Sequence, residues 1–195
     1  ESGFERSIIE RDVDELPEGD VVIDVAYSSL NYKDGLSASG SPGVTRNYPH
    51  TPGIHAAGTV AESSSAKFSQ GDEVIVIGFD LGMNTSGGFG AKIRVPSDWV
   101  VKMPDGLDLR SSMIIGTAGF TAAECIQKLE LAGLSKDAGP VLVTGATGGV
   151  GSVAVKLLAQ MGHEVHAVTG KSDKKDFLVS LGASEVLSRD QIMEG

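Results

Sequence analysis

The segment Gly145-Ala-Thr-Gly-Gly-Val-Gly151 decides how the second half of the chain folds. It repeats glycine at every third position, after the apolar run Val141–Thr144 and before the amphipathic stretch Ser152–Met161. A glycine-rich turn between a strand and a helix is typical of a pyrophosphate-binding loop, because backbone N–H groups can approach the phosphates. No Lys-Ser/Thr pair follows the glycines, so the turn is not a mononucleotide-type phosphate loop. We therefore expect a dinucleotide site with contacts from Thr147, Gly148, Gly149 and Val150; the alternative is a glycine-rich turn that binds nothing.

The sequence after the turn alternates between strand and helix patterns. Val165–Thr169 and Glu185–Leu187 read as strands. Between them Asp173–Leu181 reads as a helix, with Ser172 as its N-cap. This order is the opening of a doubly wound parallel sheet.

The end of the second strand indicates which dinucleotide is bound. Folds that bind NAD usually place Asp or Glu there, to accept hydrogen bonds from the ribose hydroxyls. Here the chain reads Thr169-Gly170-Lys171, with hydroxyl and cationic groups and no carboxylate. These residues favour NADPH, whose 2′-phosphate would meet Lys171. Lys174 and Lys175 follow but read more simply as a solvated helix face.

The first hundred residues read as short strands separated by turns. We expect strands at Ser7–Val13, Asp20–Tyr27, Gly58–Glu62, Asp72–Ile77, Ala91–Val95 and Trp99–Met103. Gly35–Gly53 is rich in Gly, Pro, Ser and Asn and reads as a long loop. Ser111 to Leu131 has a helical pattern with weak points at Gly116 and Gly119. The sequence thus predicts a β-rich domain over residues 1–110 and a nucleotide-binding domain over residues 111–195.

Composition narrows the function classes. The 195 residues carry a formal net charge of −10, which argues against a nucleic-acid binder and against docking on anionic lipid. The single cysteine, Cys125, excludes a disulfide framework and reads as a small buried residue on a helix. No run approaches the roughly 18 apolar residues of a membrane span, and no signal peptide is evident at the start. We expect a cytoplasmic protein with no membrane or nucleic-acid partner.

Only three parallel strands are predicted, about half of the usual nucleotide-binding sheet. The chain also starts without Met. These two observations lead us to expect a piece of a longer enzyme.

Longer strings resemble the medium-chain dehydrogenase/reductase superfamily. They are Ser29-Leu-Asn-Tyr-Lys-Asp-Gly35, Pro52-Gly-Ile-His-Ala-Ala-Gly58, Met113-Ile-Ile-Gly-Thr-Ala-Gly-Phe-Thr-Ala122 and the phosphate turn. They are similar to the zinc-free quinone oxidoreductase-like branch, and within it to the acryloyl-CoA reductase subgroup. The resemblance implies a GroES-like β-barrel domain joined to a Rossmann domain, an α/β fold of which this chain would hold the barrel and the first half of the Rossmann sheet.

The resemblance also implies that no metal acts in catalysis. The zinc-ligand positions of zinc-dependent relatives hold Asn31, Ile54 and Thr117, which are poor or impossible zinc ligands, and the four-Cys zinc lobe is absent. His50 and His55 remain, and two histidines without a third ligand more often pack or form hydrogen bonds. The sequence departs from the subgroup in having His55 where Asp is common, and Lys171 where Arg is frequent.

The implied reaction is hydride transfer from NADPH to the β-carbon of an α,β-unsaturated carbonyl, such as an acryloyl thioester or a quinone-like compound. Without a metal, hydrogen-bond donors must polarise the carbonyl, and the expected catalytic residues are Asn31, Tyr32, Asp34 and His55. Tyr32 is a proton donor or a cofactor-packing aromatic, and Asp34 orients neighbours or caps a turn. By family position we expect Thr117 and Thr121 to contact the nicotinamide side. The expected cofactor contacts also include Tyr32 and, from the end of the second strand, Thr169, Gly170 and Lys171. The resemblance implies a homodimer at full length.

Two other functions remain open at this point. The same fold could serve as a non-catalytic NADPH-binding sensor or structural protein, because a fold does not determine function. A zinc alcohol dehydrogenase is the third reading, which stoichiometric and essential zinc would support.

Overall fold

The computed structural model describes residues 3–193, and the chain divides into two compact units. The first unit comprises Glu1–Gly116 and the second Thr117–Gly195. The division falls inside helix α2 (Leu109–Leu131), where Gly116 has a non-helical backbone with φ of 51°. The boundary predicted from the sequence, after residue 110, is close to the start of this helix.

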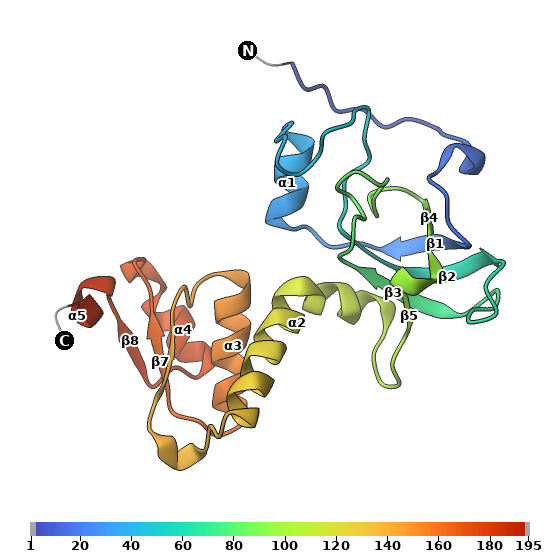
Figure 1. Ribbon diagram of the computed structural model, residues 1–195. Coiled ribbons are helices and arrows are strands. Elements are labelled where there is room, and N and C mark those ends of the chain that lie inside the picture. The colour runs from blue at the N-terminus through green and yellow to red at the C-terminus, as the bar shows by residue number, and fades with distance from the viewer. Residues whose placement is uncertain (1–2, 194–195) are drawn as a thin grey trace. The chain divides into compact units, whose positions relative to one another are not determined.

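The first unit is built on a five-stranded antiparallel sheet (Figure 1). Its strands are β1 (Val21–Tyr27), β2 (His55–Ser63), β3 (Glu73–Ile77), β4 (Lys92–Val95) and β5 (Val100–Lys102), in the order β4-β1-β2-β3-β5. The remaining elements are η1 (Val13–Glu15), α1 (Tyr32–Ala38) and η2 (Ser97–Trp99). The strand predictions from Asp20 onward are confirmed, with bounds shifted by up to three residues.

Alternation of apolar residues explains this sheet. Val21 pairs with Val95 and Ile23 with Ile93 across β1 and β4, and all four side chains are buried. They belong to one hydrophobic core, against which Val25 also packs. Side chains two residues apart share a face of a strand, which is why this core lies on one side of the sheet.

The predicted strand at Ser7–Val13 is wrong. Residues 7–12 have no regular secondary structure, and Ile8 is fully exposed. Side chains anchor this segment instead: Arg11 donates to Ser86 Oγ at 3.1 Å and to the Glu15 carbonyl at 2.6 Å. A strand needs a neighbouring strand for its hydrogen bonds, and β-forming residues alone do not supply one.

The interpretation of Gly35–Gly53 as loop throughout is also wrong, because helix α1 reaches Ala38. The sequence does contain a signal for the start of this helix, but the high glycine content of the segment obscured it. Asn31 is the N-cap, and three residues later Asp34 accepts a hydrogen bond from the Asn31 backbone N–H at 2.7 Å. This is the reciprocal pattern of a capping box with a carboxylate at the third position.

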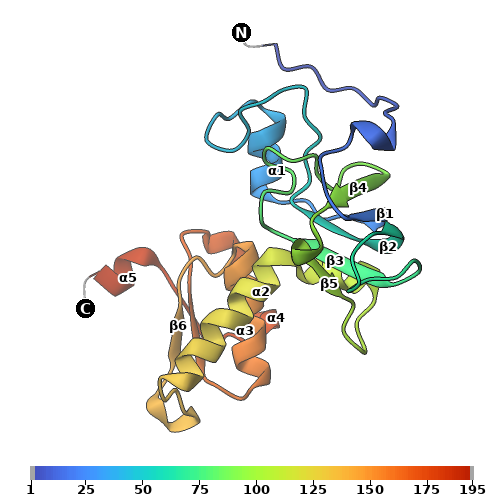
Figure 2. The ribbon, with the colours of Figure 1, turned by 45° about the vertical axis from the view of Figure 1, so that its right-hand side comes forward.

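The second unit is a three-stranded parallel sheet with helices packed on it (Figure 2). Its strands are β6 (Val141–Val143), β7 (Val165–Val168) and β8 (Glu185–Leu187), in the order β6-β7-β8. Helix α3 (Gly149–Gln160) packs on β6 and β7, and α4 (Lys175–Leu181) packs on β8. Two short helical turns, η3 (Lys136–Ala138) and η4 (Ser172–Lys174), and α5 (Arg189–Met193) complete the described part of this unit.

The alternation of strands and helices predicted for this unit is confirmed, with two local corrections. Ser172 does not cap a helix: it begins η4, and α4 follows Lys174 without a side-chain capping hydrogen bond. Cys125 lies on α2 as expected but is exposed, so its interpretation as a buried residue is wrong.

None of the helices among residues 3–193 is both long enough and apolar enough to cross a bilayer.

Candidate functional site

The glycine segment forms a tight turn from β6 into α3. Gly145 has a φ of 59°, a conformation that glycine adopts without a steric penalty, and its carbonyl accepts a hydrogen bond from the Gly148 N–H at 2.8 Å. Gly148 is the N-cap of α3 and carries no side chain that could occupy the end of the helix. The first N–H groups of an α-helix have no partner within the helix, so this end offers donors to an anion.

Neighbouring atoms leave little room for side chains at the later glycines of the turn, Gly149 and Gly151. A Cβ atom on Gly151 would lie 2.8 Å from Ala146 Cα, closer than real Cβ contacts, so a side chain there would push α3 off the strand end. A Cβ atom on Gly149 would lie 3.2 Å from the Cβ of Ala118 in α2. Thr117 and Thr121, both half-buried, are on the same part of α2.

The end of β7 lies beside the turn. The Ala146 N–H donates to the Val168 carbonyl at 3.2 Å, and the hydroxyls of Thr147 and Thr169 are 3.5 Å apart. Thr169 Oγ1 also accepts from the Lys171 N–H at 3.0 Å, which fixes the backbone of Thr169-Gly170-Lys171. The structure therefore brings the predicted phosphate turn and the predicted ribose-side residues together within the second unit.

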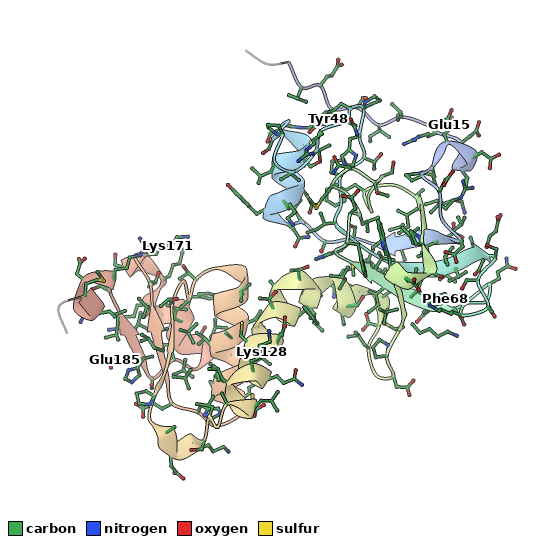
Figure 3. All side chains as sticks on the ribbon, viewed as in Figure 1. Glu15, Tyr48, Phe68, Lys128, Lys171 and Glu185 are labelled. Carbon is green, nitrogen blue, oxygen red and sulfur yellow. The ribbon has the colours of Figure 1, made fainter. Side chains whose placement is uncertain are left out.

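Arg189 is a cationic residue at this strand end that the sequence reasoning missed. It begins α5, directly after β8, and its guanidinium lies alongside Gly170: a Cβ atom on Gly170 would be 3.5 Å from Arg189 Nε. Lys171 follows β7 and lies at the same end of the sheet as Arg189. Glu185, at the start of β8, lies at the other end (Figure 3). The sequence signal was a basic residue after the third parallel strand, since carboxyl ends of parallel strands meet at one edge. Lys174, by contrast, pairs with Asp173 at 3.1 Å.

A second group of predicted residues meets in the first unit, around the carboxylate of Asp34. Asp34 is 1% exposed. It accepts hydrogen bonds from the Asn31 N–H at 2.7 Å, the Ile54 N–H at 2.9 Å and Asn31 Nδ2 at 3.3 Å. The carboxylate thus ties the start of α1 to the segment before β2.

The side-chain amide of Asn31 is directed into the protein. Besides Asp34, its Nδ2 lies 3.0 Å from Ser29 Oγ, 3.2 Å from the Ser29 carbonyl and 3.4 Å from His55 Nδ1. An amide nitrogen carries two hydrogens, so protein acceptors account for both. A role for Asn31 as the donor to a substrate carbonyl would require these bonds to rearrange.

His55 is the first residue of β2 and is 0% exposed. Its Nδ1 is hydrogen-bonded to Ser29 Oγ, and its backbone carbonyl accepts from Ser28 Oγ at 2.6 Å. Burial lowers the pKa of the imidazole, because desolvation disfavours the charged form, and the negative charge of Asp34 opposes part of that change. Ser29 was not among the residues predicted for the site, because its partner is 26 positions away in the sequence.

Tyr32 faces solvent. It is the first residue of α1 and is 85% exposed, and its hydroxyl forms no hydrogen bond with any residue of the described range 3–193. His50, the other histidine considered, has its Nε2 2.9 Å from the Gly82 carbonyl oxygen. Of the four predicted catalytic residues, Asn31, Asp34 and His55 form one network and Tyr32 stands at its edge.

Of the three residues discussed as possible zinc-ligand positions, Asn31 and Ile54 lie in the first unit and Thr117 in the second. Over residues 3–193, no three His, Cys, Asp or Glu side chains are grouped so that they could hold a metal ion.

Comparison with known proteins agrees with both halves of this description. Residues 17–105 match the alcohol dehydrogenase GroES-like domain family, and residues 141–191 match the NAD dependent epimerase/dehydratase family. The combination of a GroES-like domain with a parallel nucleotide-binding unit places the chain in the medium-chain dehydrogenase/reductase superfamily. Within the superfamily it belongs to the quinone oxidoreductase-like branch.

Individual relatives support this placement. The chain is 48% identical over all of its 195 residues to acrylyl-CoA reductase AcuI of Ruegeria pomeroyi, of which it covers 59%. It superimposes on the yhdH oxidoreductase of Salmonella enterica in complex with NADP with a TM-score of 0.91 and 48% identity, covering 95% of this chain and 57% of the other. With Bacillus subtilis yhfP with NAD bound, the TM-score is 0.87 and the identity is 48%, covering 93% of this chain and 55% of the other. The chain thus spans little more than half of the length of these relatives.

Proposed function

We propose that the full-length protein reduces the carbon–carbon double bond of an α,β-unsaturated carbonyl compound, using NADPH and no metal ion. The substrate class is a short enoyl thioester such as acryloyl-CoA, or a quinone-like compound. The observation that carries this proposal is the joint presence of the α3 glycine turn and two cations, Lys171 after β7 and Arg189 after β8, at the carboxyl ends of the parallel strands. The relatives named as acrylyl-CoA reductase, and the Salmonella structure with NADP, support the choice of reaction and cofactor.

The residues of the second unit fit a dinucleotide phosphate. Gly148 leaves the end of α3 open, and the backbone N–H groups of Gly149 and Val150 would donate to the pyrophosphate. Thr147 would add its hydroxyl, and Thr169 with Gly170 would hold the ribose. Lys171 and Arg189 would bind the 2′-phosphate, for which NADH has no counterpart. Because the protein carries a net charge of −10, this attraction must come from local groups.

NADPH, when bound, supplies the hydride that adds to the β-carbon. The chain must then stabilise the negative charge that develops on the carbonyl oxygen and supply a proton to the α-carbon. We assign one of two roles to Tyr32. It is the proton donor, since its exposed hydroxyl is accessible to a substrate, or it packs against the nicotinamide. Asn31, Asp34 and His55 form the supporting network, and Thr117 and Thr121 are assigned to the nicotinamide side.

We also propose that the full-length protein is a cytoplasmic homodimer with no metal in the reaction. Light scattering tests the dimer, and metal analysis of active protein tests the metal-free reaction: essential, stoichiometric zinc would contradict it.

The deciding experiment measures NADPH oxidation by the full-length protein with acryloyl-CoA and with a quinone, together with the affinities for NADPH and NADH. We expect turnover of at least one of the two acceptors and tighter binding of NADPH. The NAD in the Bacillus subtilis structure makes the comparison of the two cofactors necessary. NADPH binding without turnover of any activated alkene would favour a non-catalytic sensor or structural protein, and equal affinities would refute the assignment of Lys171.

A further inference from the structure

Hydrogen bonds connect the side chains of Asn31, Ser29 and His55. Asn31 Nδ2 lies 3.0 Å from Ser29 Oγ, and Ser29 Oγ is in turn bonded to His55 Nδ1. Asn31 Nδ2 is also 3.4 Å from His55 Nδ1. An amide nitrogen can only donate, whereas a hydroxyl has one hydrogen to donate and can also accept. The amide orientation of Asn31 is fixed, because its nitrogen faces two groups that only accept, the Ser29 carbonyl and the Asp34 carboxylate.

The shortest contact of the Asn31 amide nitrogen, 3.0 Å to Ser29 Oγ, favours one arrangement of hydrogens. In this arrangement Ser29 Oγ accepts from Asn31 and donates its own hydrogen to His55 Nδ1, the other side-chain atom bonded to it. If Nδ1 carried a hydrogen, that N–H would face the N–H of Asn31, and the Ser29 hydrogen would lose its acceptor. In this arrangement Nδ1 is the unprotonated nitrogen, and a neutral imidazole then carries its hydrogen on Nε2.

We propose that Ser29 is a positioning residue that holds His55 in the neutral form protonated on Nε2 and, through the same hydroxyl, fixes the amide of Asn31. Ser29 acts on the reaction only through these two side chains. The catalytic consequence rests on the proposed reduction, whereas the tautomer is a property of the resting protein.

Burial of the ring agrees with the neutral form. His55 is 0% exposed, and its pKa is lowered by desolvation. Asp34 is the charged group whose field acts on the ring, and its carboxylate is already engaged by the N–H groups of Asn31 and Ile54. Gly116 leaves room for the ring, since a Cβ atom there would lie 3.2 Å from His55 Cε1.

The test uses full-length protein labelled with 15N in histidine and long-range 1H–15N correlation spectra at neutral pH. The His55 signals are identified by their loss in His55→Gln. We expect the pattern of a neutral ring protonated on Nε2 in the wild type, a mixture of tautomers in Ser29→Ala, and the wild-type pattern in Ser29→Thr, which keeps the hydroxyl. A wild-type ring protonated on Nδ1, or a pattern unchanged in Ser29→Ala, would overturn the proposal.

Ser28→Ala is the matched control, because the Ser28 hydroxyl donates to the backbone carbonyl of His55 and not to its ring. This variant should keep the wild-type tautomer even if it is less stable. In activity assays, Ser29→Ala should lower kcat about ten-fold, the effect expected for one lost hydrogen bond, and leave the KM for NADPH unchanged. Ser29→Thr should restore kcat. If the wild type turns over no alkene, the proposed function fails while the spectra still decide the tautomer; if Ser29→Ala does not fold, the wild-type and Ser29→Thr spectra decide it.

Discussion

At the scale of single residues, the buried imidazole of His55 ties the free energy of unfolding to pH. Its pKa is lowered in the folded protein, so the unfolded chain binds a proton more readily as the pH falls through the ordinary histidine value. The stability that the neutral His55 contributes is therefore fully present above the ordinary histidine pKa. It is lost as the pH decreases toward the lower pKa of the folded state. We expect His55→Gln to weaken the loss of stability between about pH 7.5 and about pH 5.5.

Urea unfolding followed by the fluorescence of Trp99 measures this effect, since Trp99 is the only tryptophan and lies in the first unit. His50→Gln is the control, because His50 is a half-buried histidine of the same unit whose Nε2 contacts the Gly82 carbonyl oxygen. A wild-type protein whose stability has the same pH dependence as His55→Gln would contradict the assigned direction of the pKa shift.

The two cations beside Gly170 give a separate prediction. Hydrogen bonds to charged groups contribute about 1.5–3 kcal/mol, so Lys171→Ala and Arg189→Ala should each weaken NADPH binding by about ten-fold to a hundred-fold. The affinity for NADH should change little, because NADH lacks the 2′-phosphate. Fluorescence titration of full-length protein with both cofactors is the measurement. Lys174→Ala is the matched control, since Lys174 pairs with Asp173; an equal loss in all three variants would indicate a general field effect.

At the scale of elements, the start of α3 depends on the absence of a side chain at Gly151. Gly151→Ala would place a Cβ 2.8 Å from Ala146 Cα. Relief of such overpacking costs about 1–3 kcal/mol and shifts the helix end, so both the free energy of unfolding of the second unit and the affinity for NADPH should fall. Circular dichroism of the helices and NADPH titration check the two effects.

Gly35→Ala in α1 is the opposite case and serves as control. A Cβ at Gly35 would have no neighbour within 4 Å. Alanine is favoured over glycine inside a helix by about 0.5–1 kcal/mol, so this variant should be slightly more stable. Destabilisation by both substitutions would mean that packing at Gly151 is not the cause.

These elements also show what the sequence can and cannot predict. The strands and helix around the glycine turn were predicted to within a few residues, because periodicity, turn and helix start agree there. Ser7–Val13 had β-forming residues but no partner strand, and α1 was obscured by glycines although Asn31 and Asp34 marked its start. The local contacts of Thr147 and Thr169 follow from the parallel topology, which the alternation of elements indicates.

Contacts between distant segments were out of reach. Ser29 meets His55 only because β1 and β2 pair, with Tyr27 opposite Ala57. Arg189 reaches Gly170 only because β8 lies next to β7. A sequence pattern gives the type of each strand but not the register that sets such pairs, and register depends on the packed sheet.

At the scale of the whole molecule, the division into two units separates the candidate phosphate site from the His55 network. Every residue assigned to the pyrophosphate and the 2′-phosphate lies in the second unit, after Thr117, and Trp99 lies in the first. A ligand that carries only the adenosine end of NADPH should therefore stabilise the second unit by mass action.

The ligand for this test is 2′,5′-ADP, which contains the 2′-phosphate and no nicotinamide. At about 100 times its dissociation constant, it should stabilise the unit that binds it by about 2.7 kcal/mol. We expect the thermal transition of the parallel α/β unit, followed by the circular dichroism of its helices, to move to higher temperature. The transition reported by Trp99 should move less, because no phosphate-binding residue is assigned to the first unit. The control is 5′-AMP, which is 2′,5′-ADP without the 2′-phosphate, and it should act only at higher concentration, since it offers no 2′-phosphate to Lys171 and Arg189. An equal shift of both transitions would show that the two units unfold as one, and no shift at all would refute the phosphate site.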